Sequence, residues 1–65
     1  MTAKDQLKLL KAGFTIIRKE ETAMKIKFKT KEYREWRTLS GGYTSKASLQ
    51  KEMDRLLESS DIVED

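Results

Sequence analysis

The clearest pattern in the chain is a strict alternation of apolar and basic residues that starts at Met24 and ends at Lys29. Successive side chains of an extended chain point to opposite sides, so this alternation is typical of a strand with one buried side. It predicts a strand over about 23–29 whose apolar side faces the core. The basic side carries Lys25, Lys27 and Lys29.

Residues on both sides of this segment predict two further strands. Residues 14–19 are rich in β-branched and aromatic side chains and predict a strand. A third strand is expected over about 33–39, with two possible orientations. Either Trp36 faces the core, or Tyr33 and Leu39 do and Trp36 joins the lysines; a β-bulge would satisfy both sets. We favour Trp36 in the core or at its margin.

A short helix is expected before the first strand, over about residues 3–12. Thr2 is a suitable N-cap, and Asp5 three residues later gives a variant of the capping box. Gly13 stands where a helix commonly ends in the left-handed conformation. A helix of about ten residues is marginal alone, so it must dock on the sheet.

A longer helix is expected over about 45–59, after the pair Gly41-Gly42 and a cap at Thr44 or Ser45. Its apolar residues form one narrow stripe. They are Leu49, Met53, Leu56 and Leu57. Residues 60–65 form an acidic tail, which either docks through its two apolar residues or frays; fraying is the default expectation.

Together these elements predict an α+β fold in the order α-β-β-β-α, as a single domain over residues 1–65. The sheet is expected to be three-stranded and antiparallel. Each helix offers only one apolar side, so both helices are expected to pack on the apolar face of the sheet. The other face, with its lysines, would then be exposed.

The composition argues against catalysis. The 65 residues include no cysteine and no histidine, which removes thiol chemistry, imidazole acid–base catalysis and Cys/His zinc sites. We therefore expect no enzyme, no cofactor and no metal site. A secreted domain of this size would usually carry disulfides, so a cytoplasmic location is expected. No apolar run is long enough to span a membrane.

Charge is distributed unevenly along the chain. Residues 1–40 hold 11 Lys and Arg against 5 Asp and Glu, whereas residues 41–65 hold 3 against 6. Basic side chains two residues apart on a strand stand about 7 Å from one another, close to the spacing of phosphates along a nucleic-acid strand. The predicted nucleic-acid contacts are Lys25, Lys27, Lys29, Lys31, Arg34, Arg37 and the aromatic Trp36.

The expected function is that of a small non-enzymatic nucleic-acid-binding protein, with DNA favoured over RNA, such as an accessory protein of a phage or mobile element. The same lysines would also serve simply to keep a sheet face soluble. The alternative is a protein-binding regulator or inhibitor that uses the exposed sheet face or an edge strand. The chain is expected to be a monomer or a weak homodimer.

The segment Gly42-Tyr43-Thr44-Ser45-Lys46-Ala47, preceded by basic strands, resembles the arm-type or AP2-like DNA-binding domains of integrases. In that family a three-stranded sheet enters the major groove, and a similar step leads into a helix. The resemblance covers about half of the chain and implies DNA contacts from the basic strand residues. This chain differs by having an extra helix before the sheet and no recombinase domain after it.

The order α-β-β-β-α is also similar to that of double-stranded-RNA-binding domains. Those domains carry a lysine-rich motif at the start of the last helix. Here the corresponding helix offers only Lys46 and Lys51 and is net acidic.

Overall fold

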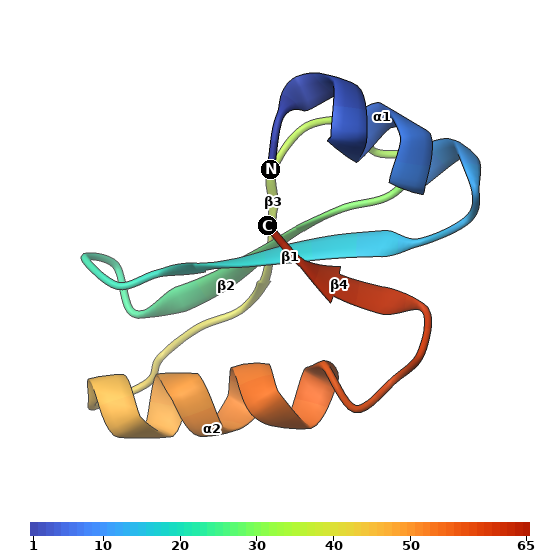
Figure 1. Cartoon of the computed structure of the whole chain (residues 1–65). Helices are drawn as coiled ribbons and strands as arrows, with labels where there is room; N and C mark the ends of the chain where they lie inside the picture. The colour runs from blue at the N-terminus through green and yellow to red at the C-terminus, as the bar shows by residue number, and fades with distance from the viewer.

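The computed structural model describes all 65 residues and confirms the predicted α+β class (Figure 1). The three expected strands pair antiparallel in chain order, β1 with β2 and β2 with β3. Neither helix is long and apolar enough to cross a membrane. The elements are α1 (Ala3–Lys11), β1 (Thr15–Glu20), β2 (Lys25–Lys29), β3 (Arg37–Ser40), α2 (Lys46–Leu56) and β4 (Ile62–Glu64).

Helix α1 begins and ends as its sequence predicts. The Asp5 amide donates to Thr2 Oγ1 at 3.2 Å, which satisfies one of the free N–H groups of the first turn. Gly13 has φ 96°, and the Phe14 amide donates to the Leu9 carbonyl at 3.0 Å. This left-handed ending turns the chain directly from α1 into β1.

The expectation of a frayed tail is wrong, because residues 62–64 form a fourth strand. Strand β4 pairs in parallel with β1, and the sheet order is β3-β2-β1-β4. Ile62 packs against the core on the α2 side of the sheet. The Asp65 amide donates to the Ile17 carbonyl at 2.8 Å. Apolar burial and backbone pairing together hold the end of the chain.

The expectation that both helices share one face of the sheet is also wrong. Figure 1 shows α1 above the sheet and α2 below it. The reason lies in β1, where the consecutive residues Ile16 and Ile17 point to opposite faces and are both completely buried. Ile17 packs with α2, whereas α1 contacts β1 and buries Leu10 on the side of Ile16.

The larger core lies between the sheet and α2. Its fully buried members come from β1, β2 and α2, and a ring of half-buried apolar residues surrounds them. The buried members are Ile17, Ile26, Leu49 and Met53, and the surrounding residues are Met24, Phe28, Tyr43, Leu56, Leu57 and Ile62. This arrangement confirms that the apolar side of β2 and the stripe of α2 face each other.

The third strand is shorter than predicted, because residues 30–36 form a loop before β3. Thr38 pairs with Lys27 and Ser40 with Ile26, so Leu39 is an extra residue that makes a bulge. Leu39 remains 45% exposed. Residues 33–36, which include two aromatic side chains, thus lie outside the sheet, and only β3 pairs with β2.

Candidate nucleic-acid interface

Lys25, Lys27 and Lys29 lie on one face of β2, as predicted, and the pairing of β1 with β2 shows which other residues share that face. In the antiparallel pair of β1 and β2, Arg18 lies opposite Lys27 and Glu20 lies opposite Lys25. Ile16 lies opposite Lys29, so all these side chains share one face of the sheet. We call this the lysine face: Arg18, Glu20, Lys25, Lys27 and Lys29.

The lysine face is less open than expected. Lys25 Nζ lies 3.7 Å and Lys27 Nζ 3.5 Å from Glu20 Oε2, so one carboxylate serves two lysines. That oxygen is buried and accepts no hydrogen bond. All three lysines of β2 are half-buried. A single acidic residue on β1 therefore offsets part of the charge that the alternating pattern of β2 predicts.

Trp36 is half-buried and lies on the lysine face, as in the alternative in which it joins the lysines, and not in the favoured place in the core or at its margin. Tyr33 and Leu39, which that alternative placed in the core, are exposed. Lys29 Nζ is 4.6 Å and the Arg18 guanidinium carbon 5.1 Å from the centre of the Trp36 ring. Lys29 also donates to Gln6 Oε1 of α1 at 3.0 Å. The half-buried indole is thus flanked by two cations, a favourable arrangement for its electron-rich ring, and α1 closes this end of the face.

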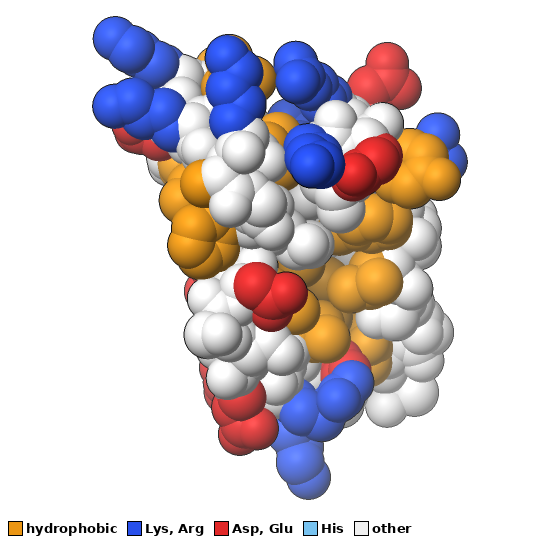
Figure 2. All heavy atoms as spheres, turned by 90° about the vertical axis from the view of Figure 1, so that its right-hand side faces the viewer, with side chains coloured by type: hydrophobic (Ala, Val, Ile, Leu, Met, Phe, Trp, Pro, Cys, Tyr) orange, Lys and Arg blue, Asp and Glu red, His pale blue; other side chains and the backbone are white.

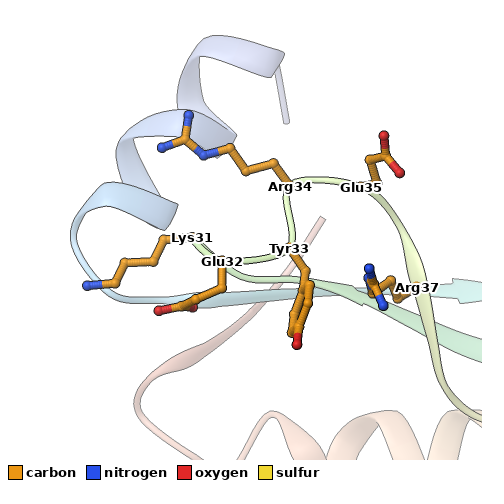
Figure 3. Close-up of a pocket in the computed structure, with 6 residues that line it drawn as sticks. All are labelled: Lys31, Glu32, Tyr33, Arg34, Glu35 and Arg37. Carbon is orange, nitrogen blue, oxygen red and sulfur yellow. The ribbon is translucent and has the colours of Figure 1, made fainter.

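The remaining predicted contacts lie in the loop and at the start of β3. A shallow hollow of about 520 Å³ is lined by residues of this segment (Figure 3). Arg37 lies opposite Phe28 in the sheet and therefore points to the α2 side, away from the lysine face. In Figure 3, Arg34 extends in the opposite direction from Tyr33, while Arg37 lies beside that ring. The lining residues are Lys31, Glu32, Tyr33, Arg34, Glu35 and Arg37.

The predicted residues thus form two groups instead of one continuous patch. Lys25, Lys27, Lys29 and Trp36 share the lysine face. Lys31, Arg34 and Arg37 line the loop hollow. The two groups meet where β2 runs into the loop at Thr30.

The ion pairs show which Lys and Arg side chains have no carboxylate partner. Of the 14 Lys and Arg residues, five lie within 4.0 Å of a carboxylate: Lys19, Lys25, Lys27, Lys46 and Arg55. Eight of the other nine fall within residues 4–37. These eight are Lys4, Lys8, Lys11, Arg18, Lys29, Lys31, Arg34 and Arg37.

Three of these unpaired lysines were missed in the sequence prediction. Lys4, Lys8 and Lys11 are all exposed on α1. Their spacing of four and three residues puts them on one side of the helix, opposite the side that buries Leu10. The prediction of this helix rested on its capping and apolar residues and did not use the spacing of its lysines.

The unpaired cations of α1 and of the loop lie at the same end of the molecule. A small hollow is lined jointly by Gly13 and Phe14, just after α1, and by Thr30 and Lys31 at the start of the loop. Figure 2 shows Lys and Arg side chains gathered at the top of the view, at the level of α1, with a few acidic ones among them. We call Lys4, Lys8, Lys11, Lys31 and Arg34 the basic end.

The acidic residues offer no comparable site. No group of three or more His, Cys, Asp or Glu side chains is placed to hold a metal ion. Helix α2 has one well-defined ion pair, in which Arg55 donates to both carboxylate oxygens of Glu52. This hydrogen bonding lowers the pKa of Glu52 and raises the pKa of Arg55.

Comparison of this chain with protein-family models, with curated proteins and with solved structures finds no match in any of the three.

Proposed function

We propose that the protein binds nucleic acid, DNA in the first place, by placing phosphates along the basic end and the adjoining lysine face. The observation that carries this proposal is the placement of the unpaired cations. Eight of the nine Lys and Arg residues without a nearby carboxylate belong to residues 4–37. Of the residues of α2, only Lys51 is a cation without such a partner.

Unpaired cations that stand close together repel one another, and a polyanion relieves that repulsion. Binding also releases the counterions condensed on the nucleic acid, which supplies a favourable, salt-dependent contribution to affinity. The lysines of α1 reach Lys11 in its last turn, where the negative end of the helix dipole favours a cation. The dipole therefore favours the charges of Lys8 and Lys11, which both lie in the last turn, but not that of Lys4 in the first turn.

The proposal predicts the size of the salt dependence. If the five cations of the basic end each neutralise one phosphate, log K falls with log salt with a slope of about −4.5. Further contacts from the lysine face would make the slope steeper. A 20-base-pair DNA labelled with fluorescein, titrated by fluorescence anisotropy at several salt concentrations, measures this slope directly.

A pair of triple variants makes the test specific to a surface. Changing Lys4, Lys8 and Lys11 to Gln removes three charges from the basic end and should make the slope shallower by about 2.7. Changing Lys46, Lys51 and Arg55 to Gln removes the same charge from α2. The α2 variant should bind with nearly the wild-type slope.

Two results would contradict the proposal. The first is that the wild-type protein shows no salt-sensitive binding to DNA in either duplex or single-stranded form, which ends the nucleic-acid interpretation. Alternatively, the two triple variants lose affinity equally, in which case only net charge matters and no particular surface is used.

The competing candidate is a protein-binding module that uses the outer edge of β3. This strand ends the sheet on one side, and its Leu39 is 45% exposed. An unpaired edge can accept a strand from another chain. However, β3 has only four residues and contains the bulge, and both features discourage such pairing. We therefore favour the nucleic-acid function.

A further inference from the structure

The loop hollow contains Tyr33, which is the most exposed aromatic side chain of the molecule. Tyr33 is 47% exposed, whereas Trp36 and Tyr43 are half-buried. A tyrosine combines a flat apolar ring with a polar hydroxyl, which makes an exposed tyrosine well suited to contact a ligand. The contacts around Tyr33 are therefore relevant to what it could bind.

Tyr33 is held in place by contacts from three directions. Its amide donates to Thr30 Oγ1 at 3.1 Å, and its carbonyl accepts from the Thr30 amide at 3.0 Å. Its ring meets that of Phe28 at 84°, with 6.5 Å between centres. The Arg37 guanidinium carbon lies 4.2 Å from the centre of the Tyr33 ring. An aromatic ring fixed in this way can receive a ligand without first being ordered.

The charge of the hollow is mixed, which limits what phosphates alone can contribute. Three cations line it together with the carboxylates of Glu32 and Glu35. None of the five takes part in an ion pair within 4.0 Å. The two carboxylates weaken phosphate binding by Lys31 and Arg34 without preventing it, so a further contact would add affinity at this point. Stacking on the exposed ring is the contact that the geometry offers.

We infer that Tyr33 and Arg37 form a stacking site for an unpaired base, so that the preferred ligand is single-stranded nucleic acid; this rests on the proposed function. A base inside a duplex is covered by its neighbours above and below, and it cannot lie on a side chain in a hollow. The guanidinium of Arg37 lies over one face of the Tyr33 ring, so an unpaired base that turns outward would stack on the other face. Lys31 and Arg34 would meet the phosphates of the same strand.

Three oligonucleotides separate stacking from phosphate binding: a 12-nucleotide single strand, the same strand with its central bases replaced by abasic sites, and the 12-base-pair duplex. All carry fluorescein and are titrated by anisotropy. The wild-type protein should bind the normal strand about 5- to 100-fold more tightly than the abasic one, as expected for a stacked base. The duplex should also bind more weakly than the normal strand.

The variants Tyr33→Leu and Tyr33→Phe complete the experiment. Tyr33→Leu should bind the normal strand only as tightly as the wild type binds the abasic strand, while its affinity for the abasic strand is unchanged. A far-UV circular dichroism spectrum and a urea unfolding transition like those of the wild type show that the variant is folded. Tyr33→Phe keeps the ring and should retain the preference for normal bases. The slope with salt should be the same for all three proteins, since no phosphate contact is altered.

Two outcomes would overturn the inference, and they can be told apart. If the wild type binds the normal and abasic strands equally and Tyr33→Leu changes nothing, stacking is absent and the proposed backbone binding still stands. If none of the oligonucleotides binds even at low salt, the proposed function and the stacking site both fail.

Discussion

Glu20 on β1 and Lys27 on β2 form an ion pair across the lysine face, with 3.5 Å between Oε2 and Nζ. The same oxygen lies 3.7 Å from Lys25 and accepts no hydrogen bond. If the proposed function is correct, a phosphate on this face must compete with the carboxylate of Glu20 for the same two lysines. Glu20 thus neutralises part of the positive charge of the lysine face.

The variant Glu20→Gln should release both lysines for phosphate binding. Affinity for nucleic acid should rise, and the slope of log K against log salt should steepen by about 0.9 for each lysine that takes up a phosphate. The loss of stability should be small, because these side chains are only partly buried and solvent-accessible ion pairs contribute about 0–1 kcal/mol each. Anisotropy titration at several salt concentrations provides the measurement.

The control for this variant is Glu58→Gln, which makes the same change in net charge just after the end of α2, where Glu58 is exposed and in no ion pair. Glu58→Gln should leave the slope unchanged. Equal gains in the two variants would mean that Glu20 acts only through the net charge of the protein.

A smaller core lies between α1 and the sheet, and substitution of Leu10 tests how much this core contributes to stability. Leu10 is only 3% exposed, so Leu10→Ala should lower the free energy of unfolding by about 2–5 kcal/mol. Leu7 lies on the same helix but is 38% exposed, and Leu7→Ala should change it by no more than about 0.5 kcal/mol. Urea unfolding followed by Trp36 fluorescence measures both. Similar losses in the two variants would contradict the burial of Leu10 against β1.

Ile62 tests whether β4 is part of the stable fold. Its side chain packs against the core on the α2 side, so Ile62→Ala should lower the free energy of unfolding by about 1–3 kcal/mol. Glu64→Ala, on the same strand at an exposed position, should have little effect. Hydrogen exchange gives a second measurement, because the Asp65 amide bonds to the Ile17 carbonyl. Rapid exchange at Asp65 in the wild type would show that the strand frays.

The ion pair of α2 makes a prediction about pH. Hydrogen bonding from Arg55 lowers the pKa of Glu52. A carboxylate with a lowered pKa in the folded state stabilises the protein above its ordinary pKa, and this stabilisation is lost as the pH falls through the lowered value. Arg55→Gln should return the pKa of Glu52 toward the ordinary range of a glutamate. Titration of the Glu52 side-chain carbon by NMR measures the change; an identical midpoint in both proteins would contradict it.

Much of the local structure could be predicted because neighbouring residues decide it. The alternation in β2, the cap at Thr2 and the ending of α1 at Gly13 all depend on residues a few positions apart. These features follow from backbone geometry and hold whatever the rest of the chain does. The α+β class and the antiparallel order of β1, β2 and β3 followed from them.

The candidate site was predicted only in part. The lysines of β2 and the cations of the loop were identified from their spacing and charge. Their separation into two groups was not, because it depends on where the chain leaves the ladder between Lys29 and Arg37. The lysines of α1 were missed, although the regular spacing of Lys4, Lys8 and Lys11 is a signal that could have identified them.

The amino-acid order alone thus accounts for the two helices, for strands β1 and β2 and for the excess of positive charge in residues 1–40. The assembly of those segments decided the rest. Ile16 and Ile17 point to different faces of the sheet, and both are buried because α1 packs on one face and α2 on the other. Strand register then placed Glu20 between Lys25 and Lys27. Such contacts join residues far apart in the chain, and no local pattern specifies them.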